Sequence, residues 1–364
     1  MKDQKNTLAT ALLKLQSLNL GKEQVRRVAV ASQGTLHLEV HEGKNQRFFV
    51  FEKNELSELL AENDSKIPLV SSLRESESIN DDTIISYRPG RRLVLRPLGD
   101  KQGCILKAYK KNKSLRAAKN YAIAQSACEQ GGFDIPELLQ YETKTDCLVM
   151  AGRIGHTPVI SSDATSIWAD TGSRLRQFQS SHSQNGLDEF SSRDELQVLD
   201  ERARRFLLCL NALPEAWQAG RERLESASIN LPKAMMGLAH RDLHDGQLIV
   251  TGEDISLLDF DLICRADMAL DAGNLLAHMK LRTLQGRHLG AESAYSDCSE
   301  AFLSGLGRQL ETGFESRLHF YRATTFYRLA LLYALRPRWS HLAEPLIAEG
   351  ERHLDAMNQG RDAS

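Results

Sequence analysis

The chain has 364 residues, of which 41% are hydrophobic and 26% are charged, and its formal net charge is -2. This composition is typical of a folded protein with two or three packed units. Basic and acidic residues are interspersed, so we expect no nucleic-acid partner. The sequence has no apolar run of membrane-spanning length and no signal-like opening segment, which predicts no membrane partner and a cytoplasmic location. Its six cysteines include no C-x-x-C pair, so neither a zinc site nor a disulfide framework is predicted.

Residues 1–80 are predicted to form an opening helix, three strands and a second helix. The strands are expected at residues 27–31, 35–40 and 47–51, and the second helix around residues 54–62. Two interpretations of this region stay open. It is either a small appended domain or an extension that covers one face of the sheet that follows.

Residues 81–150 combine strand-like runs with one helix. The runs at residues 91–96 and 104–109 flank a turn and predict a hairpin, and a helix is expected at residues 114–130. Lys107 lies inside the second run, whereas the neighbouring lysines follow it. Residues 147–150 predict a last strand that ends at Met150. The arginines before the hairpin are either surface charges beside a turn or contacts to a phosphate or substrate.

Helices dominate after residue 151. Apolar residues at helical spacing predict helices at residues 167–182, 193–218, 291–309, 314–335 and 341–357, and a further helix opens at Asp271. Residues 240–271, which lie among these helices, instead contain two short apolar runs and several acids.

Two acids and an amide flank a predicted hairpin in this segment. Residues 248–250 and 255–258 are apolar and residues 251–254 are turn formers, which predicts two antiparallel strands. A turn centred near Glu253 places Gln247 opposite Asp259. A carboxylate and an amide oxygen suit magnesium, which takes one or two protein ligands and completes its shell with water and phosphate oxygens. Asp242 precedes Gln247 closely enough to orient a hydroxyl or amine nucleophile and accept its proton.

These motifs resemble the aminoglycoside phosphotransferase and choline kinase branch of the protein-kinase-like superfamily. The matching residues are His240, Asp242, Leu243, His244, Gly246 and Gln247, then Leu258, Asp259, Phe260 and Asp261, and finally Leu270 and Asp271. The resemblance implies an α+β, two-lobed fold, with a small β-rich nucleotide-binding lobe at residues 81–150 and a larger helical lobe at residues 151–364 that holds the catalytic loop and the acceptor site. Residues 1–80 lie outside it, as an extra N-terminal α/β region.

The resemblance also implies an ATP-dependent phosphotransferase that acts on a hydroxyl of a small molecule, either sugar-like or an amino alcohol. Asp242 would be the catalytic base, Asp259 the principal Mg2+ ligand and Gln247 the second ligand. Lys107 would contact the alpha and beta phosphates, and main-chain groups around Met150 would bind the adenine.

Two departures from the family keep a second function open. Asn is the commoner residue at the position of Gln247, and the extra methylene moves the amide oxygen by roughly 1.5 Å. Glu129 is the only Glu in the predicted helix at residues 114–130, and it either pairs with Lys107 or faces solvent. The alternative is therefore a catalytically silent, kinase-like nucleotide-binding or regulatory protein. Asp271 and Asn274 are expected to support the catalytic loop in either case.

The identity of the acceptor, the choice between ATP and GTP and the oligomeric state are not predicted. Four acids either line a pocket for a polycationic acceptor or are solvated surface charges. They are Asp261, Asp267, Glu292 and Asp297.

Overall fold

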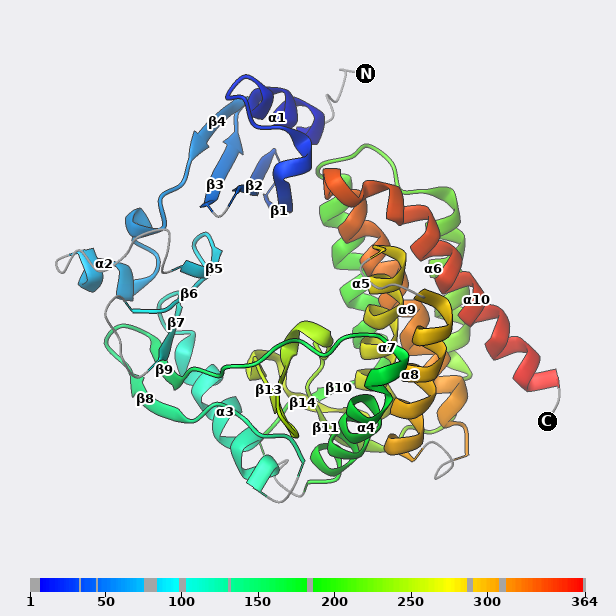
Figure 1. Cartoon of the computed structure of the whole chain (residues 1–364). Helices are drawn as coiled ribbons and strands as arrows, with labels where there is room; N and C mark the ends of the chain where they lie inside the picture. Colours follow the sequence, from blue (N-terminus) through cyan, green and yellow to red (C-terminus); the bar gives the residue numbers. More distant parts are fainter. Residues whose placement is uncertain are drawn as a thin grey trace.

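The chain forms three successive groups of elements, coloured from blue to red in Figure 1. A computed structural model describes residues 7–32, 34–43, 45–74, 84–97, 103–129, 132–181, 186–286, 291–307 and 312–362. An N-terminal sheet comes first, a second sheet with one long helix follows, and a group of helices makes up the rest. This arrangement confirms the predicted α+β, two-lobed fold with an extra N-terminal region.

The N-terminal region has its own antiparallel sheet, in the order β1-β2-β3-β4. Its elements are α1 (Thr7–Gln16), η1 (Lys22–Gln24), β1 (Val25–Ser32), β2 (Thr35–Glu42), β3 (Asn45–Glu52), β4 (Glu55–Glu58), η2 (Ala61–Asn63) and α2 (Pro68–Arg74). The three predicted strands are confirmed, but the helix predicted around residues 54–62 is wrong. Lys53 and Asn54 both have positive φ, 51° and 65°, and this two-residue turn sends the chain back along β3 as β4. Strand pairing therefore overrides the helical composition of the segment.

The second sheet has the strand order β5-β6-β7-β9-β8. Its region comprises β5 (Ile84–Arg88), β6 (Arg92–Leu95), β7 (Cys104–Tyr109), α3 (Ser114–Glu129), β8 (Leu138–Glu142) and β9 (Cys147–Ala151). Strand β7 is central, so Lys107 pairs with Val94 of β6 on one side and with Leu148 of β9 on the other. This position buries Lys107, which retains only 7% exposure as a whole residue.

Helices form most of the third group. Its elements are η4 (Ser162–Ala164), α4 (Thr165–Gln179), β10 (Glu189–Phe190), α5 (Ser192–Leu207), α6 (Glu215–Ile229), β11 (Met236–Ala239), η5 (Asp245–Gln247), β12 (Leu248–Thr251), β13 (Asp254–Leu257), η6 (Phe260–Leu262), β14 (Cys264–Asp267), α7 (Ala269–Leu284), α8 (Ala291–Leu306), α9 (Phe314–Ala334), η8 (Pro337–Leu342) and α10 (Ala343–Asp362). The helix predicted at residues 193–218 is instead α5 and α6, because Pro214 disfavours helix in the residue before it. No helix in the described ranges is long and apolar enough to cross a membrane.

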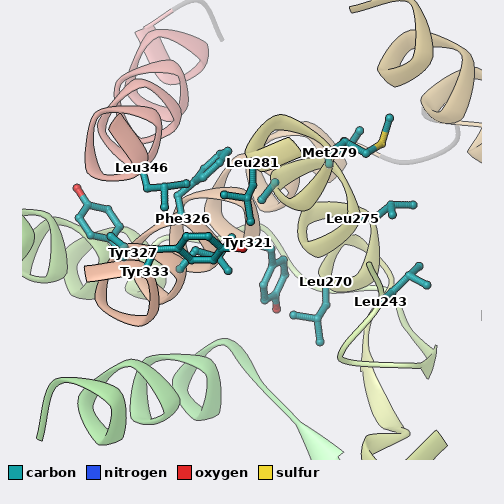
Figure 2. Packing of buried hydrophobic residues seen from close by; sticks show 14 of the residues in the cluster. Leu243, Leu270, Leu275, Met279, Leu281, Tyr321, Phe326, Tyr327, Tyr333 and Leu346 are labelled. Carbon is teal, nitrogen blue, oxygen red and sulfur yellow. The ribbon is translucent and has the colours of Figure 1, made fainter. Parts of the chain in front are cut away.

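Helices α7, α9 and α10 pack around a shared core (Figure 2). Leu281 comes from α7, Phe326 from α9 and Leu346 from α10, and all three side chains are fully buried. Truncating one of them to Ala would cost about 2–5 kcal/mol of stability. Because α7 follows the acidic segment directly, this core also anchors the end of that segment.

The N-terminal region contacts both of the other groups. Its Leu15 and Val28 belong to one hydrophobic cluster with the helices, and Phe48 packs edge-on against Tyr87 of β5 with ring centroids 4.9 Å apart. Arg27 of β1 donates a hydrogen bond to the carbonyl of Tyr87 at 2.9 Å, while β1 also contacts α5 and η8. The N-terminal sheet thus contacts both lobes without joining the second sheet, and residues 61–70 of the same region pack against that second sheet.

Candidate active site

The hairpin of β12 and β13 carries the two motifs at its ends. Thr251 pairs with Asp254, so the turn between the strands contains two residues. The main-chain N–H of Leu258 donates to the carbonyl of Gln247 at 2.9 Å. The predicted hairpin is confirmed, but the predicted pairing of Gln247 with Asp259 is one residue out, because the turn is centred earlier. Asp259 follows in the left-handed conformation, with φ of 63°.

Two side chains of α7 hold the loop that precedes this hairpin and carries Asp242. The carboxylate of Asp271 accepts hydrogen bonds from the main-chain N–H groups of His240 and Arg241, each at 2.7 Å. The amide nitrogen of Asn274 donates to the carbonyl of Arg241 at 3.0 Å. Arg241 has φ of 70°, a conformation unfavourable for a side-chain-bearing residue, and these bonds offset its cost. The predicted supporting role of Asp271 and Asn274 is confirmed, and it fixes the backbone just before Asp242.

Lys107 lies in a compact group of charges with both acids of the second motif. Its Nζ donates to Oδ1 of Asp259 at 2.9 Å and to Oδ1 of Asp261 at 2.7 Å. Nη1 of Arg92 contacts the Oδ2 atoms of the same two acids at 3.1 and 2.7 Å. The hydroxyl of Tyr109 donates to Asp261 at 2.7 Å. The structure therefore brings Lys107 and Asp259 together, and two cations balance two carboxylates.

These contacts set the charge of Asp259. Burial alone would raise the pKa of its carboxyl, but Lys107 and Arg92 outweigh this effect and hold the pKa well below its usual range. Burial, reinforced by the charge of Asp261, raises the pKa of the Tyr109 phenol, so that the hydroxyl stays a hydrogen-bond donor. Asp259 is thus fully ionised at neutral pH, as a ligand of a hard cation must be.

Arg92 is a site residue that the sequence did not single out. It begins β6, directly after the turn from β5, and its side chain is largely buried against the acids. Asp64 of the N-terminal region holds this turn, because its carboxylate accepts hydrogen bonds from the N–H of Gly90 and, at 3.0 Å, from the hydroxyl of Tyr87. The arginines before the hairpin had two interpretations, and that of surface charges beside a turn is wrong for Arg92. The sequence feature that could have indicated this role is an arginine between a glycine-containing turn and an apolar strand.

Helix α3 does not supply the carboxylate that pairs with Lys107. Glu129 is exposed at the end of the helix and accepts a hydrogen bond from Gln125 at 3.3 Å. The helix instead uses Asn120, whose amide donates to the carbonyls of Phe260 and Asp261 at 3.2 and 3.1 Å. Asp261 therefore stands where the resemblance implies a helix Glu, and α3 holds the acidic motif through its backbone.

The segment after β9 crosses the hairpin. Met150 lies in β9, one residue before the strand ends. His156 and Val250 of β12 exchange main-chain hydrogen bonds at 3.1 and 2.8 Å. A Cβ on Gly155 would lie 2.4 Å from the carbonyl oxygen of Val250, so this crossing requires glycine. The last strand of the sheet is thereby joined to the hairpin that carries the motifs.

The side chains of Gln247 and His244 lie side by side. The N–H of Gly246 donates to Nδ1 of His244 at 3.0 Å, and burial lowers the pKa of this histidine, so the neutral ring carries its proton on Nε2. Nε2 lies 3.4 Å from the amide nitrogen of Gln247, and two nitrogens that both carry protons favour the amide turned the other way. An amide turned with its oxygen toward this proton keeps a second oxygen lone pair for a cation. Together with the carboxylate of Asp259, this oxygen matches the donor set of magnesium.

The two lobes, the lysine on a central strand and the two motifs around a hairpin define the protein-kinase-like class. The phosphotransferase enzyme family matches residues 90–306, which is more than half of the chain, and the chain belongs to this family. The predicted relationship to aminoglycoside phosphotransferases and choline kinases is confirmed. No curated protein matches the chain significantly.

Solved structures of related fold include three informative neighbours. A choline/ethanolamine kinase family protein from Mesorhizobium loti is 20% identical, with a TM-score of 0.53 over 76% of this chain and 92% of that chain. Amicoumacin kinase, solved with AMP-PNP, Ca2+ and Ami, is 14% identical, with a TM-score of 0.54 over 80% and 94%. Choline kinase from Streptococcus pneumoniae is 13% identical, with a TM-score of 0.52 over 79% and 98%. These likenesses show the kinase-like fold, and the family supports a small-molecule phosphotransferase.

Proposed function

We propose that the protein transfers the gamma phosphate of ATP to a hydroxyl of a sugar-like molecule or an amino alcohol. The observation that carries this proposal is the charged group of Lys107 and Arg92 with the two acids of the second motif, beside the supported catalytic loop. The complex of amicoumacin kinase with AMP-PNP and Ca2+ supports a nucleotide with a divalent cation. Magnesium on Asp259 and Gln247 would neutralise charge on the phosphates.

In this proposal Lys107 contacts the alpha and beta phosphates, and Asp261 orients it. The ammonium is buried on a central strand and held at 2.7 Å by Asp261, so its position is set before the nucleotide arrives. Asp259, which contacts Lys107 and Arg92 in this structure, would hold the metal ion when Mg-ATP is bound. Preorganised positive charge of this kind stabilises the charge that the phosphoryl group spreads over its oxygens.

Asp242 is the proposed catalytic base. It follows the loop backbone held by Asp271, and its own N–H donates to Nδ1 of His240 at 3.3 Å. The acceptor hydroxyl oxygen bonds to the gamma phosphorus while the bond from that phosphorus to the oxygen of the leaving ADP breaks. The hydroxyl proton passes to the carboxylate of Asp242.

A catalytically silent nucleotide-binding protein is the second candidate. It is favoured by Lys107 and Arg92, which in this structure contact both carboxylate oxygens of Asp259. If these contacts persist with nucleotide, the principal metal ligand stays blocked and no transfer follows. The two candidates differ in whether magnesium tightens nucleotide binding and whether ADP forms.

The test is ADP formation from Mg-ATP across a panel of sugars and amino alcohols. Asp242→Ala should lower turnover by about 10²–10⁴-fold while the affinity for Mg-ATP stays largely unchanged. Asp254→Ala, in the exposed β13 end of the same hairpin, is the matched control and should keep full activity. Unchanged turnover in Asp242→Ala contradicts the proposal, whereas tight nucleotide binding without transfer to any acceptor favours the silent alternative.

Further predictions from the sequence accompany this proposal. The adenine is expected on main-chain groups around Met150, and the protein is expected in the cytoplasm without a nucleic-acid partner. The division into residues 1–80, 81–150 and 151–364 also stays a prediction. Limited proteolysis that cuts near these boundaries would support it.

A further inference from the structure

The acids that the sequence offered for a polycationic acceptor are engaged with other partners. Each contacts a cation or a hydroxyl of the protein itself. They are Asp261 on Lys107, Asp267 on Arg317, Glu292 on Lys280 and Asp297 on Ser162. These carboxylates are therefore already partnered, and none of them marks an open cation pocket.

Arg328 of α9 instead reaches the catalytic loop. Its Nη2 donates at 2.8 Å to the amide oxygen of Asn274, whose nitrogen holds the carbonyl of Arg241, the residue before Asp242. Nε of Arg328 is buried without a hydrogen bond and lies 3.9 Å from Glu195, the nearby acid. Burial raises the pKa of Glu195, although Arg328 and Arg241 oppose this, so this acid balances the arginines only weakly.

Arg202 lies seven residues, or about two helical turns, after Glu195 on α5, so it shares the helix face on which Glu195 approaches Arg328 of α9. Arg202 is solvent-accessible. Burial by the surrounding protein lowers the pKa of its guanidinium, and the charge of Arg328 lowers it further. The charge of Asp242 raises this pKa and so opposes both effects. Arg88 of β5 resembles Arg202 in its charge, because burial and then Arg92 lower its pKa to about 10. In the described part of the chain, neither Arg88 nor Arg202 has a carboxylate at ion-pair distance.

We propose that Arg202 and Arg328 form an anion subsite beside Asp242, and that the acceptor carries a phosphate or carboxylate group in addition to its reactive hydroxyl. This inference rests on the proposed function and names the substrate class of the same site. Like charges held together are unfavourable, and a bound anion removes this cost while the guanidinium groups give it paired hydrogen bonds. The same arginines would repel a polycationic acceptor.

The test uses the full chain with Mg-AMP-PNP bound, so that the nucleotide occupies the phosphate contacts proposed for Lys107. Calorimetry compares glucose, glucosamine, gluconate and glucose 6-phosphate, with inorganic phosphate as a probe that is independent of the sugar. Phosphate should bind, and at least one anionic sugar should bind at least about 10-fold tighter than glucose. Whether gluconate or glucose 6-phosphate is preferred distinguishes a carboxylate from a phosphate acceptor.

Arg202→Gln should weaken anion binding by about 10-fold without changing the affinity for Mg-AMP-PNP. Arg204→Gln is the matched control, because Arg204 is exposed on the same helix and donates to the carbonyl of Asp200. The subsite is overturned if phosphate does not bind, if glucose or glucosamine binds as tightly as the anionic sugars, or if the two variants behave alike. Anion binding that depends on Arg202, without phosphoryl transfer, contradicts the proposed function and leaves the subsite standing.

Discussion

The two sides of the catalytic loop differ in how their charges are balanced. On the nucleotide side, the lysine of β7 and the arginine of β6 contact the two acids of the second motif at 2.7 to 3.1 Å. On the other side, among the described residues, Arg202 has no carboxylate at ion-pair distance, and the carboxylate at ion-pair distance from Arg328 is the buried Glu195, at 3.9 Å. Lys107 and Arg92 are thus paired with carboxylates before any ligand binds, whereas the two arginines on the other side are not paired as closely.

This difference teaches how each ligand would gain affinity. A nucleotide with its metal must replace existing ion pairs, and part of its interaction energy offsets the contacts that are lost. In the proposed subsite, an anionic acceptor would instead meet two cations that have no carboxylate closer than 3.9 Å in the described residues, and it would relieve their repulsion. Substitutions among the paired charges near the nucleotide should therefore change affinity by leaving a charge unpaired. Substitutions near Arg202 and Arg328 should change affinity through the net charge of the proposed anion subsite.

The largest effect is expected from Asp259→Asn. This change removes the principal metal ligand and leaves Lys107 and Arg92 to repel each other around a single acid. Turnover should fall by about 10³-fold, and Mg2+ should no longer tighten ATP binding. Steady-state kinetics measure the turnover, and thermal shifts with ATP at different magnesium concentrations measure the effect of Mg2+ on ATP binding. Activity close to that of the unaltered protein would contradict the metal assignment.

Asp261→Asn should affect nucleotide binding more than chemistry. Lys107 keeps Asp259 but loses its second anchor, so KM for ATP should rise about 10-fold while kcat changes less. Tyr109→Phe is the matched control, because it removes one hydrogen bond to the same carboxylate and keeps all the charges. A fall in kcat with unchanged KM would instead place Asp261 in the chemical step.

Glu195→Gln should change anion affinity in the direction opposite to that expected for Arg202→Gln. Removal of this acid leaves Arg328 without its nearest carboxylate and makes the subsite more positive. Affinity for phosphate should rise about 5-fold, equivalent to about 1 kcal/mol. Calorimetry with Mg-AMP-PNP bound measures this change, and weaker phosphate binding would argue against an anion subsite at Arg328.

The smallest expected effect is on the stability of the fold. It concerns His353 of α10, which lies outside the candidate active site. Burial lowers the pKa of His353, which stacks on Phe326 with ring planes 6° apart, so the folded protein resists its protonation. Its contribution is present above the ordinary pKa of about 6.5 and is lost as pH falls, at up to about 1.4 kcal/mol per pH unit. The melting temperature should drop below pH 6.5, and less so in His353→Phe. Equal acid sensitivity of the two proteins would contradict this role.

The sequence predicted most of the elements that position the site. Strand 104–109 and the hairpin after Gln247 are recognisable from apolar runs and turn formers within a few residues, and the motif spacing indicated the family. The register error at Asp259 arose from a turn centre misplaced by half a residue. The helix error at residues 54–62 arose because pairing with β3, which helical composition does not record, decided the structure of that segment.

The sequence by itself determined the two-lobed fold, the acidic motifs and the lysine on its strand, because local periodicity and turn chemistry act between near neighbours. Only the tertiary structure decided which charges meet. Arg92 and Asp261 are 169 residues apart in the chain, yet they lie in contact. Electrostatic pairing depends on distance in space, so the balanced nucleotide side and the unbalanced arginines of α5 and α9 became visible only after folding had brought these segments together.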